Sequence, residues 1–188
     1  RPGVIIVGGG PAGASAAIIL ARLGYAVTVV DRAHFPRSRI GASLPPKIDG
    51  LLAILGVLPR VQQAGFARMR GTVVDQGEGL LFHEFDPEAG RRGYQVDRAQ
   101  FDKILLDEAA RAGASVHEGV TAVSLRYERG RVSGLRAKQG QTEQDMSARW
   151  VLDASGAAAW GARASGLGQR DVVRTVALCG YWRQSRLP

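Results

Sequence analysis

The chain has 188 residues, with 25 Lys and Arg against 17 Asp and Glu, which gives a formal net charge of +8. Hydrophobic residues make up 45% and charged residues 22%, values of a globular domain that exclude a disordered, collagen-like or coiled-coil chain. The basic residues are spread along the chain, which argues against nucleic-acid binding, and the positive charge is compatible with an acidic protein partner. The single cysteine, Cys179, excludes an intramolecular disulfide and a Cys-based zinc site. This cysteine usage favours a cytoplasmic protein over a secreted one. No apolar run of about 18 residues and no signal-peptide pattern is present, so we expect no membrane span.

The N-terminal segment has the pattern of a βαβ unit. A short run of β-branched residues leads into a glycine-rich turn. A helix-like run of mostly small apolar residues follows, and a second run of β-branched residues ends in an acidic residue. The expected elements are a strand at 4–7, the turn at 8–13, a helix at 14–23 and a strand at 26–30 that is closed by Asp31. This order predicts an α/β fold with a parallel sheet.

The remaining elements are predicted from glycine and proline residues that interrupt regular structure, from the alternation of apolar and polar residues, and from helix-capping residues. Asp97 with Gln100 three residues later predicts the start of a helix. In chain order, we expect a loop at 34–46, a helix at 47–55, a hairpin of 69–75 and 80–85, a helix from Asp97 to Ala112, and strands at 115–118, 121–127, 132–138, 150–152 and 172–182.

The glycine spacing Gly8-x-Gly10-x-x-Gly13 indicates a nucleotide-binding turn because it lies between a predicted strand and a predicted helix. The first glycine permits the tight turn, the second permits close approach of a diphosphate, and the third permits close packing of helix on strand. Asp31 lies 18 residues after Gly13, near the spacing at which a carboxylate accepts hydrogen bonds from ribose hydroxyls. The segment therefore predicts an adenine-dinucleotide site.

Four motifs in this order together resemble the FAD-dependent monooxygenase superfamily, which has a para-hydroxybenzoate-hydroxylase-like FAD fold. They are GGGPAG at 8–13, FPRSRIGASL at 35–44, YQVDRAQFD at 94–102 and VLDASG at 151–156. Within that superfamily the chain is similar to the branch of flavin-dependent halogenases and geranylgeranyl-reductase-like enzymes. The resemblance implies FAD as the cofactor, O2 as co-substrate, and NAD(P)H or a separate flavin reductase as electron donor.

The resemblance also implies which residues contact the cofactor. The glycine-rich turn would approach the diphosphate, Asp31 the ribose, and residues 40–43 would pass the isoalloxazine as a strap. The implied cofactor-binding residues are Gly8, Gly10, Pro11, Ala12, Gly13, Asp31, Arg32, Arg39, Ile40, Gly41, Ala42, Ser43, Arg98, Asp153 and Gly156. No catalytic acid or base is assigned, and the three histidines, His34, His83 and His117, lack the spacing of metal ligands.

Departures from the halogenase pattern lead us to expect hydroxylation. Ala42 stands where these halogenases usually have Glu, and Met69 stands where they have an essential Lys, although a shift of the alignment by one residue would place Arg68 or Arg70 there. A thioether lacks the charge and donors of Lys. The expected function is therefore hydroxylation of an aromatic substrate through a flavin hydroperoxide, the substrate being a small molecule or a carrier-bound or peptide-bound tryptophan-like ring. The alternatives are a flavin-dependent halogenase, a geranylgeranyl-reductase-like enzyme and a non-catalytic dinucleotide-binding remnant.

The expected fold is a three-layer, Rossmann-like FAD-binding domain with part of an inserted β-sheet substrate region. We expect the FAD-binding unit and strap at 1–65, the start of the substrate-binding region at 66–96, the continued FAD-binding domain at 97–170, and a strand leading into the substrate domain at 171–188. The chain begins without Met and stops directly after a strand-like run, so we expect a fragment of a longer protein.

Overall fold

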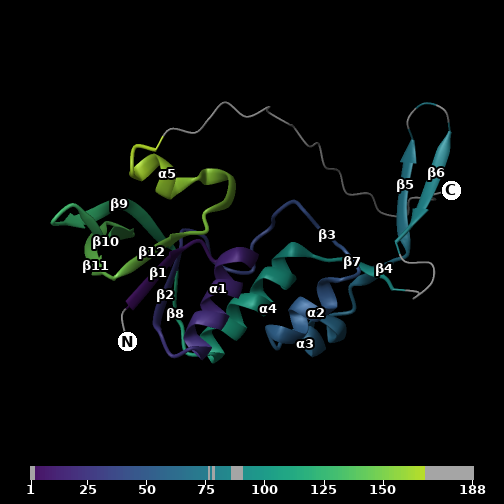
Figure 1. Cartoon of the computed structure of the whole chain (residues 1–188), viewed down its shortest axis with the longest axis horizontal. Helices are drawn as coiled ribbons and strands as arrows, with labels where there is room; N and C mark the ends of the chain where they lie inside the picture. The colour runs from purple at the N-terminus through teal and green to yellow at the C-terminus, as the bar shows by residue number, and fades with distance from the viewer. Residues whose placement is uncertain (1–2, 76, 78, 86–90, 168–188) are drawn as a thin grey trace.

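The structure is a computed structural model that describes residues 3–75, 77, 79–85 and 91–167 (Figure 1). The expected strand at 172–182, the expected domain segment 171–188 and Cys179 lie outside the described residues.

The predicted βαβ unit is present at the N-terminus. Strand β1 spans Gly3–Val7, helix α1 spans Pro11–Arg22 and strand β2 spans Ala26–Asp31. Two later strands join them, β8 at Ser115–Glu118 and β12 at Trp150–Asp153. The four form a parallel sheet in the order β12-β1-β2-β8, so the carboxyl ends of β1, β2 and β12 lie at one edge.

The apolar residues of β1 divide between the two faces of the sheet because successive side chains of a strand point in opposite directions. Val4 and Ile6 belong to the core under α1 and helix α4, which spans Arg98–Arg111. Ile5 and Val7 pack on the other face against a second sheet. This sheet is antiparallel, in the order β11-β10-β9, with β9 at Val120–Glu128, β10 at Arg131–Gln139 and β11 at Thr142–Ser147. The three layers that the sequence predicts are therefore present.

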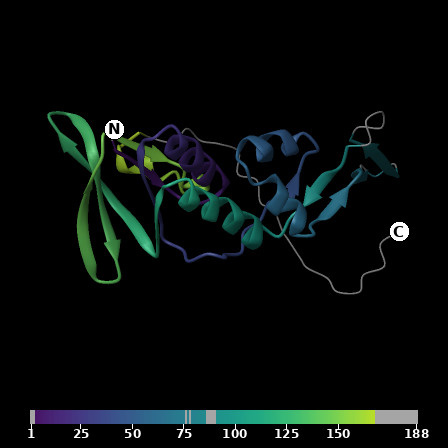
Figure 2. The ribbon, with the colours of Figure 1, turned by 90° about the horizontal axis from the view of Figure 1, so that it is seen from below.

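The elements that lie between β2 and α4 in the sequence are found toward the N-terminal end of α4 (Figures 1 and 2). They are α2 at Ile48–Ile54, α3 at Leu58–Gln63, the small sheet of β3 (Ser43–Leu44), β7 (Gly93–Gln95) and β4 (Ala67–Met69), and the hairpin of β5 (Gly71–Asp75) and β6 (Leu80–Glu84). In both views the green β9–β11 sheet and this hairpin occupy opposite ends of the molecule.

Several elements depart from the sequence-based expectations. The expected continuous strand at 69–75 is two strands, since β4 ends at Met69 and β5 begins at Gly71. The expected loop at 34–46 contains β3, which pairs with β7. Helix α3, strands β4, β7 and β11, the 3-10 helix at Gly156–Ala158 and helix α5 at Trp160–Ala164 were not predicted. All of these elements have six residues or fewer, too short to display a clear period.

Candidate functional site

The glycine-rich turn between β1 and α1 can be built only with small residues at its two ends. Gly8 has φ +110°, and a Cβ there would collide with the Ala154 carbonyl oxygen. A Cβ on Gly13 would collide with the Gly8 carbonyl oxygen. These contacts give the first and third glycines the packing roles that the motif predicts.

The second glycine has a different environment. Gly10 is the N-cap of α1, Pro11 occupies the first helical position, and the side chain of Ala12 is exposed. A Cβ on Gly10 would have one neighbouring side chain within contact distance, the Nη2 atom of Arg37 at 3.4 Å. Because the first backbone N–H groups of a helix lack intrahelical acceptors, this end of α1 can bind an anion.

Asp31 ties the end of β2 to the turn. One carboxylate oxygen accepts a hydrogen bond from the Gly9 backbone N–H at 2.8 Å, and the other accepts from the Ala33 N–H at 2.8 Å. A carboxylate oxygen can accept two hydrogen bonds, so each oxygen retains capacity for a ribose hydroxyl. Asp31 therefore ends β2 and orders the turn, and its contact with a ribose stays a prediction.

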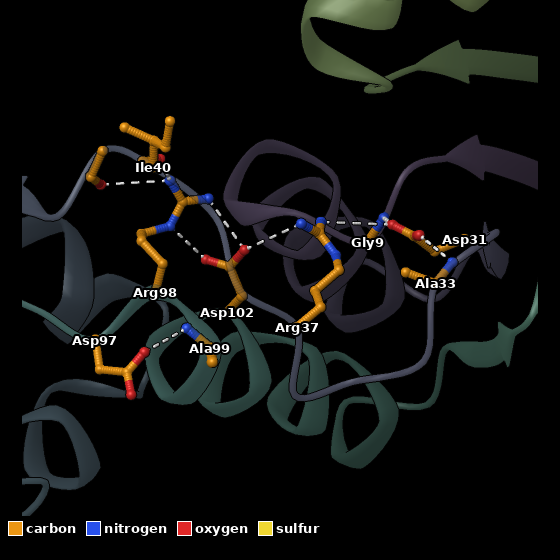
Figure 3. A network of polar contacts seen from close by, with 10 residues as sticks. Gly9, Asp31, Ala33, Arg37, Ile40, Asp97, Arg98, Ala99 and Asp102 are labelled. Carbon is orange, nitrogen blue, oxygen red and sulfur yellow. Dashed lines mark hydrogen bonds and ion pairs between the residues drawn. The ribbon is translucent and has the colours of Figure 1, made fainter. Parts of the chain in front are cut away.

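Arg37 lies in the same cluster, although the sequence analysis did not single it out (Figure 3). Its guanidinium lies 3.6 Å from Asp31 and 3.8 Å from Asp102, and it stacks over the Phe35 ring at 4.5 Å. The sequence did contain a signal for this residue, because Arg37 lies on the loop that follows the acidic end of β2.

Arg98 holds the strap from the first turn of α4 (Figure 3). Its Nη1 donates to the carbonyl oxygens of Ile40 at 2.8 Å and Gly41 at 3.3 Å. Its Nε and Nη2 donate to the two oxygens of Asp102 at 2.8 Å and 3.0 Å. The guanidinium is therefore fixed on both sides, and it connects α4 to the strap.

Two further strap residues are anchored, whereas two predicted arginines outside the strap are exposed. The Ala42 carbonyl accepts from the Val96 N–H at 2.8 Å, and the Ser43 hydroxyl donates to Gln95 at 2.8 Å. Arg32 and Arg39 are exposed. The structure thus brings the strap and Arg98 together, whereas these two arginines remain open to solvent.

The carboxylate of Asp153, at the end of β12, orders the loop that leads into α5. It accepts hydrogen bonds from the backbone N–H groups of Ser155 at 3.0 Å and Gly161 at 2.7 Å. Burial acts to raise the pKa of Asp153, but the hydrogen bonds from Ser155, Gly161 and Ala162 outweigh it and hold the pKa below its ordinary value. Gly156 follows with φ +67°. Asp153 is the last residue of β12, which pairs with β1 in the sheet, and Gly156 lies three residues further on.

A mainly apolar cavity of about 180 Å³ lies beside the strap. It is lined by Pro11 and Ser15 of α1, by Gly41, by Arg98, and by apolar residues of β3, α2 and α4. Arg98 is the cationic residue in this lining. The cavity can therefore hold an apolar group beside a cationic residue.

Residues 68–70 lie on a different part of the molecule. Arg68 stacks on the Tyr94 ring at 3.7 Å and pairs with Asp49 at 3.7 Å. Burial raises the pKa of Tyr94, and the Asp49 carboxylate adds to that rise while Arg68 opposes it. Arg70 donates to Glu84 at 3.2 Å. Both arginines that flank the half-buried Met69 therefore have partners of their own.

Within the described residues, no helix has the length and apolar character needed to cross a membrane.

Comparison with known proteins finds a family match and a consistent group of relatives. Residues 2–178 match the family model described as an FAD binding domain. The chain is 33% identical to a tryptophan 2-halogenase from Chondromyces crocatus over 98% of its own length and 36% of the relative's. It is 33% identical to a 1H-pyrrole-2-carbonyl-[peptidyl-carrier protein] chlorinase from Pseudomonas fluorescens over 90% of its length and 42% of the relative's. The solved structure of the myxobacterial chondrochloren halogenase superposes with a TM-score of 0.77 at 33% identity, covering 82% of this chain and 37% of that one. The chain thus spans about two fifths of the length of these relatives.

These relatives overturn the expectation of aromatic hydroxylation. The curated relatives and the solved structure described above are halogenases, and halogenation was one of the three alternatives. The expectation was wrong because it let two positions, Ala42 and Met69, outweigh the likeness of the rest of the chain.

Proposed function

Because this chain belongs to the FAD-binding domain family, we propose that it forms the dinucleotide-binding part of a flavin-dependent halogenase. The observation that carries the proposal is the 33% identity to a tryptophan 2-halogenase over 98% of the chain. The geometry supports it, since the turn, the acidic strand end and the strap lie around the N-terminus of α1.

The residues of this site fit FAD. The turn of Gly8, Gly10 and Gly13 leaves the N-terminal amides of α1 open to a diphosphate. Asp31 retains acceptor capacity for the ribose. The strap, held by Arg98, borders the apolar cavity that would take part of the flavin. When bound, reduced FAD supplies the O2-dependent oxidation of halide, and the reactivity belongs to the cofactor.

We further propose an electron-rich aromatic substrate, free or bound to a carrier. Two relatives act on tryptophan and on a pyrrole held by a peptidyl-carrier protein. The net charge of +8 favours an acidic carrier through electrostatic steering. Electrons would come from NAD(P)H or from a separate flavin reductase, and a cytoplasmic location stays a prediction.

The position that resembles the halogenase Lys is Met69, and the flanking cations are already paired with Asp49 and Glu84. This arrangement would slow halogen transfer relative to an enzyme with Lys, because a thioether has no donor and no charge. The proposal therefore includes a weakly active halogenation site.

The test begins with flavin absorbance and fluorescence on titration of the chain with FAD. The protein that contains the chain is then incubated with reduced FAD, O2, chloride or bromide, and tryptophan or a carrier-bound pyrrole. Mass spectrometry distinguishes a product that has gained halogen, with its isotope doublet, from one that has gained oxygen. A halogenated product supports the proposal, and an oxygenated product formed at every halide concentration contradicts it.

A further inference from the structure

The carboxylate of Asp102 is the most buried charge of the described residues. It is 0% exposed, and it sits on α4 between two arginines that come from different parts of the chain. Arg98 lies on the same helix, four residues earlier, and Arg37 comes from the loop after β2. A buried carboxylate requires such partners, because burial of an unpaired charge is strongly unfavourable.

The two arginines are held differently. The hydrogen bonds of Arg98 to Asp102 are 2.8 Å and 3.0 Å long, which is the range of charged hydrogen bonds. The ion pairs of Arg37, at 3.6 Å and 3.8 Å, are longer than hydrogen bonds. Its Nε is buried and has no hydrogen-bond partner among the described residues. Arg37 therefore carries donors that the protein itself does not use.

The place of Arg37 indicates what would use them. Its side chain is 13% exposed, and its Nη2 faces Gly10, the residue that caps α1. Figure 3 shows the guanidinium between Asp31 and Asp102, beside the turn. A diphosphate at the N-terminus of α1 carries two negative charges, and the planar guanidinium fork matches phosphate oxygens. The neighbouring carboxylates hold Arg37 by charge and leave its hydrogen-bonding donors free.

We propose that Arg37 is a diphosphate-binding residue of the dinucleotide site, and that Asp102 is the positioning residue that holds Arg37 toward the turn and Arg98 toward the strap. The inference rests on the proposed FAD binding and names two residues beyond the predicted set. Asp102 would thereby connect the two ends of the cofactor site, with the diphosphate at one guanidinium and the strap carbonyls of Ile40 and Gly41 at the other.

The test compares Arg37→Gln with Arg136→Gln. Arg136 also pairs with an aspartate, Asp145 at 3.0 Å, but it lies on the β9–β11 sheet. Both substitutions remove one positive charge, so a general electrostatic effect would be the same. We expect Arg37→Gln to weaken FAD binding about tenfold or more and Arg136→Gln to leave it within about twofold. Arg37→Lys, which keeps the charge and loses the fork, should fall between them.

Competition with ADP and with adenosine separates a phosphate contact from a structural role. In Arg37→Gln, ADP should compete less well by the same factor as FAD, and adenosine should compete as it does with the unaltered chain. Equal losses for ADP and adenosine, or unchanged FAD binding in Arg37→Gln, would overturn the inference while leaving the proposed function intact. Failure of the unaltered chain to bind FAD would overturn the proposed function itself.

The positioning role of Asp102 is tested by combining the substitutions. In an Asp102→Asn background Arg37 keeps its ion pair with Asp31 but loses the one with Asp102, so Arg37→Gln should weaken FAD binding by a clearly smaller factor than it does in the unaltered chain. Full additivity of the two effects would contradict the positioning role. If Asp102→Asn does not fold, as judged by circular dichroism, the comparison of ADP with adenosine in Arg37→Gln still decides the inference.

Discussion

The Asp31 carboxylate accepts a hydrogen bond at 2.8 Å from the backbone N–H of Gly9. This bond joins the end of β2 to the turn that begins α1. The same carboxylate also accepts from the Ala33 N–H. The group that is expected to bind the ribose therefore also holds the turn in shape. We therefore expect stability and cofactor binding to be coupled at Asp31.

Substitution of Asp31 by Ala should lower both properties. It leaves the N–H groups of Gly9 and Ala33 without their acceptor, which should cost about 1–3 kcal/mol in the free energy of unfolding, and FAD binding should weaken about tenfold. Urea unfolding and FAD titration measure the two effects. Asp75→Ala is the matched control, because Asp75 also accepts from a backbone N–H, that of Gly77 at 2.8 Å, but at an exposed place on the hairpin. A loss of stability as large in the control would contradict the special role of Asp31.

Gly13 should tolerate no side chain. Because a Cβ there collides with the Gly8 carbonyl oxygen, Gly13→Ala should destabilise the fold by about 3 kcal/mol or more. Gly50, inside α2, has no atom within 4 Å of a Cβ position, so Gly50→Ala should stabilise by up to about 1 kcal/mol. The melting temperatures of the two variants, measured by thermal unfolding, test this prediction. Similar melting temperatures would contradict it and would show that the turn can relax around a Cβ.

Restoring the Lys of the halogenase pattern should raise activity. In the protein that contains this chain, Met69→Lys should increase halogenation of an aromatic probe about tenfold or more, because a charged donor is supplied where none exists. Arg70→Lys, which adds no charge, should have a much smaller effect. Product formation followed by mass spectrometry is the measurement, and an increase in Arg70→Lys alone would instead place the functional position at residue 70.

The hydrogen bonds to Asp153 predict a particular pH dependence of stability. Because the folded pKa lies below the ordinary value, their contribution is fully present above about pH 4, the unfolded pKa, and is lost as pH falls through the lower folded pKa. Asp153→Asn should therefore unfold at a lower urea concentration than the unaltered chain at neutral pH, with the difference shrinking in acid. Urea midpoints measured across this range test the prediction, and a difference independent of pH would contradict it.

The local parts of the site could be predicted from the sequence because each is encoded by neighbouring residues. The turn needs Gly8 and Gly13, and Asp97 caps α4 by accepting from the Ala99 N–H at 2.8 Å. The small sheet at the strap could not be predicted, since β3 has two residues and exists through its pairing with β7. The relation of Asp153 to α5 was hidden for a similar reason, because α5 has five residues.

The sequence by itself determined the βαβ unit and the dinucleotide motif, because β-branched runs, helix caps and glycine spacing act over a few residues. The three-layer class was implied by the resemblance of four motifs to a known family. Only the tertiary structure decided that Arg37, Asp102 and Arg98 meet around one buried carboxylate. Arg37 belongs to an irregular loop, and no local period fixes the direction in which its side chain points. Its position follows from the packing of that loop against α4, where a charge excluded from water must find a partner of opposite sign.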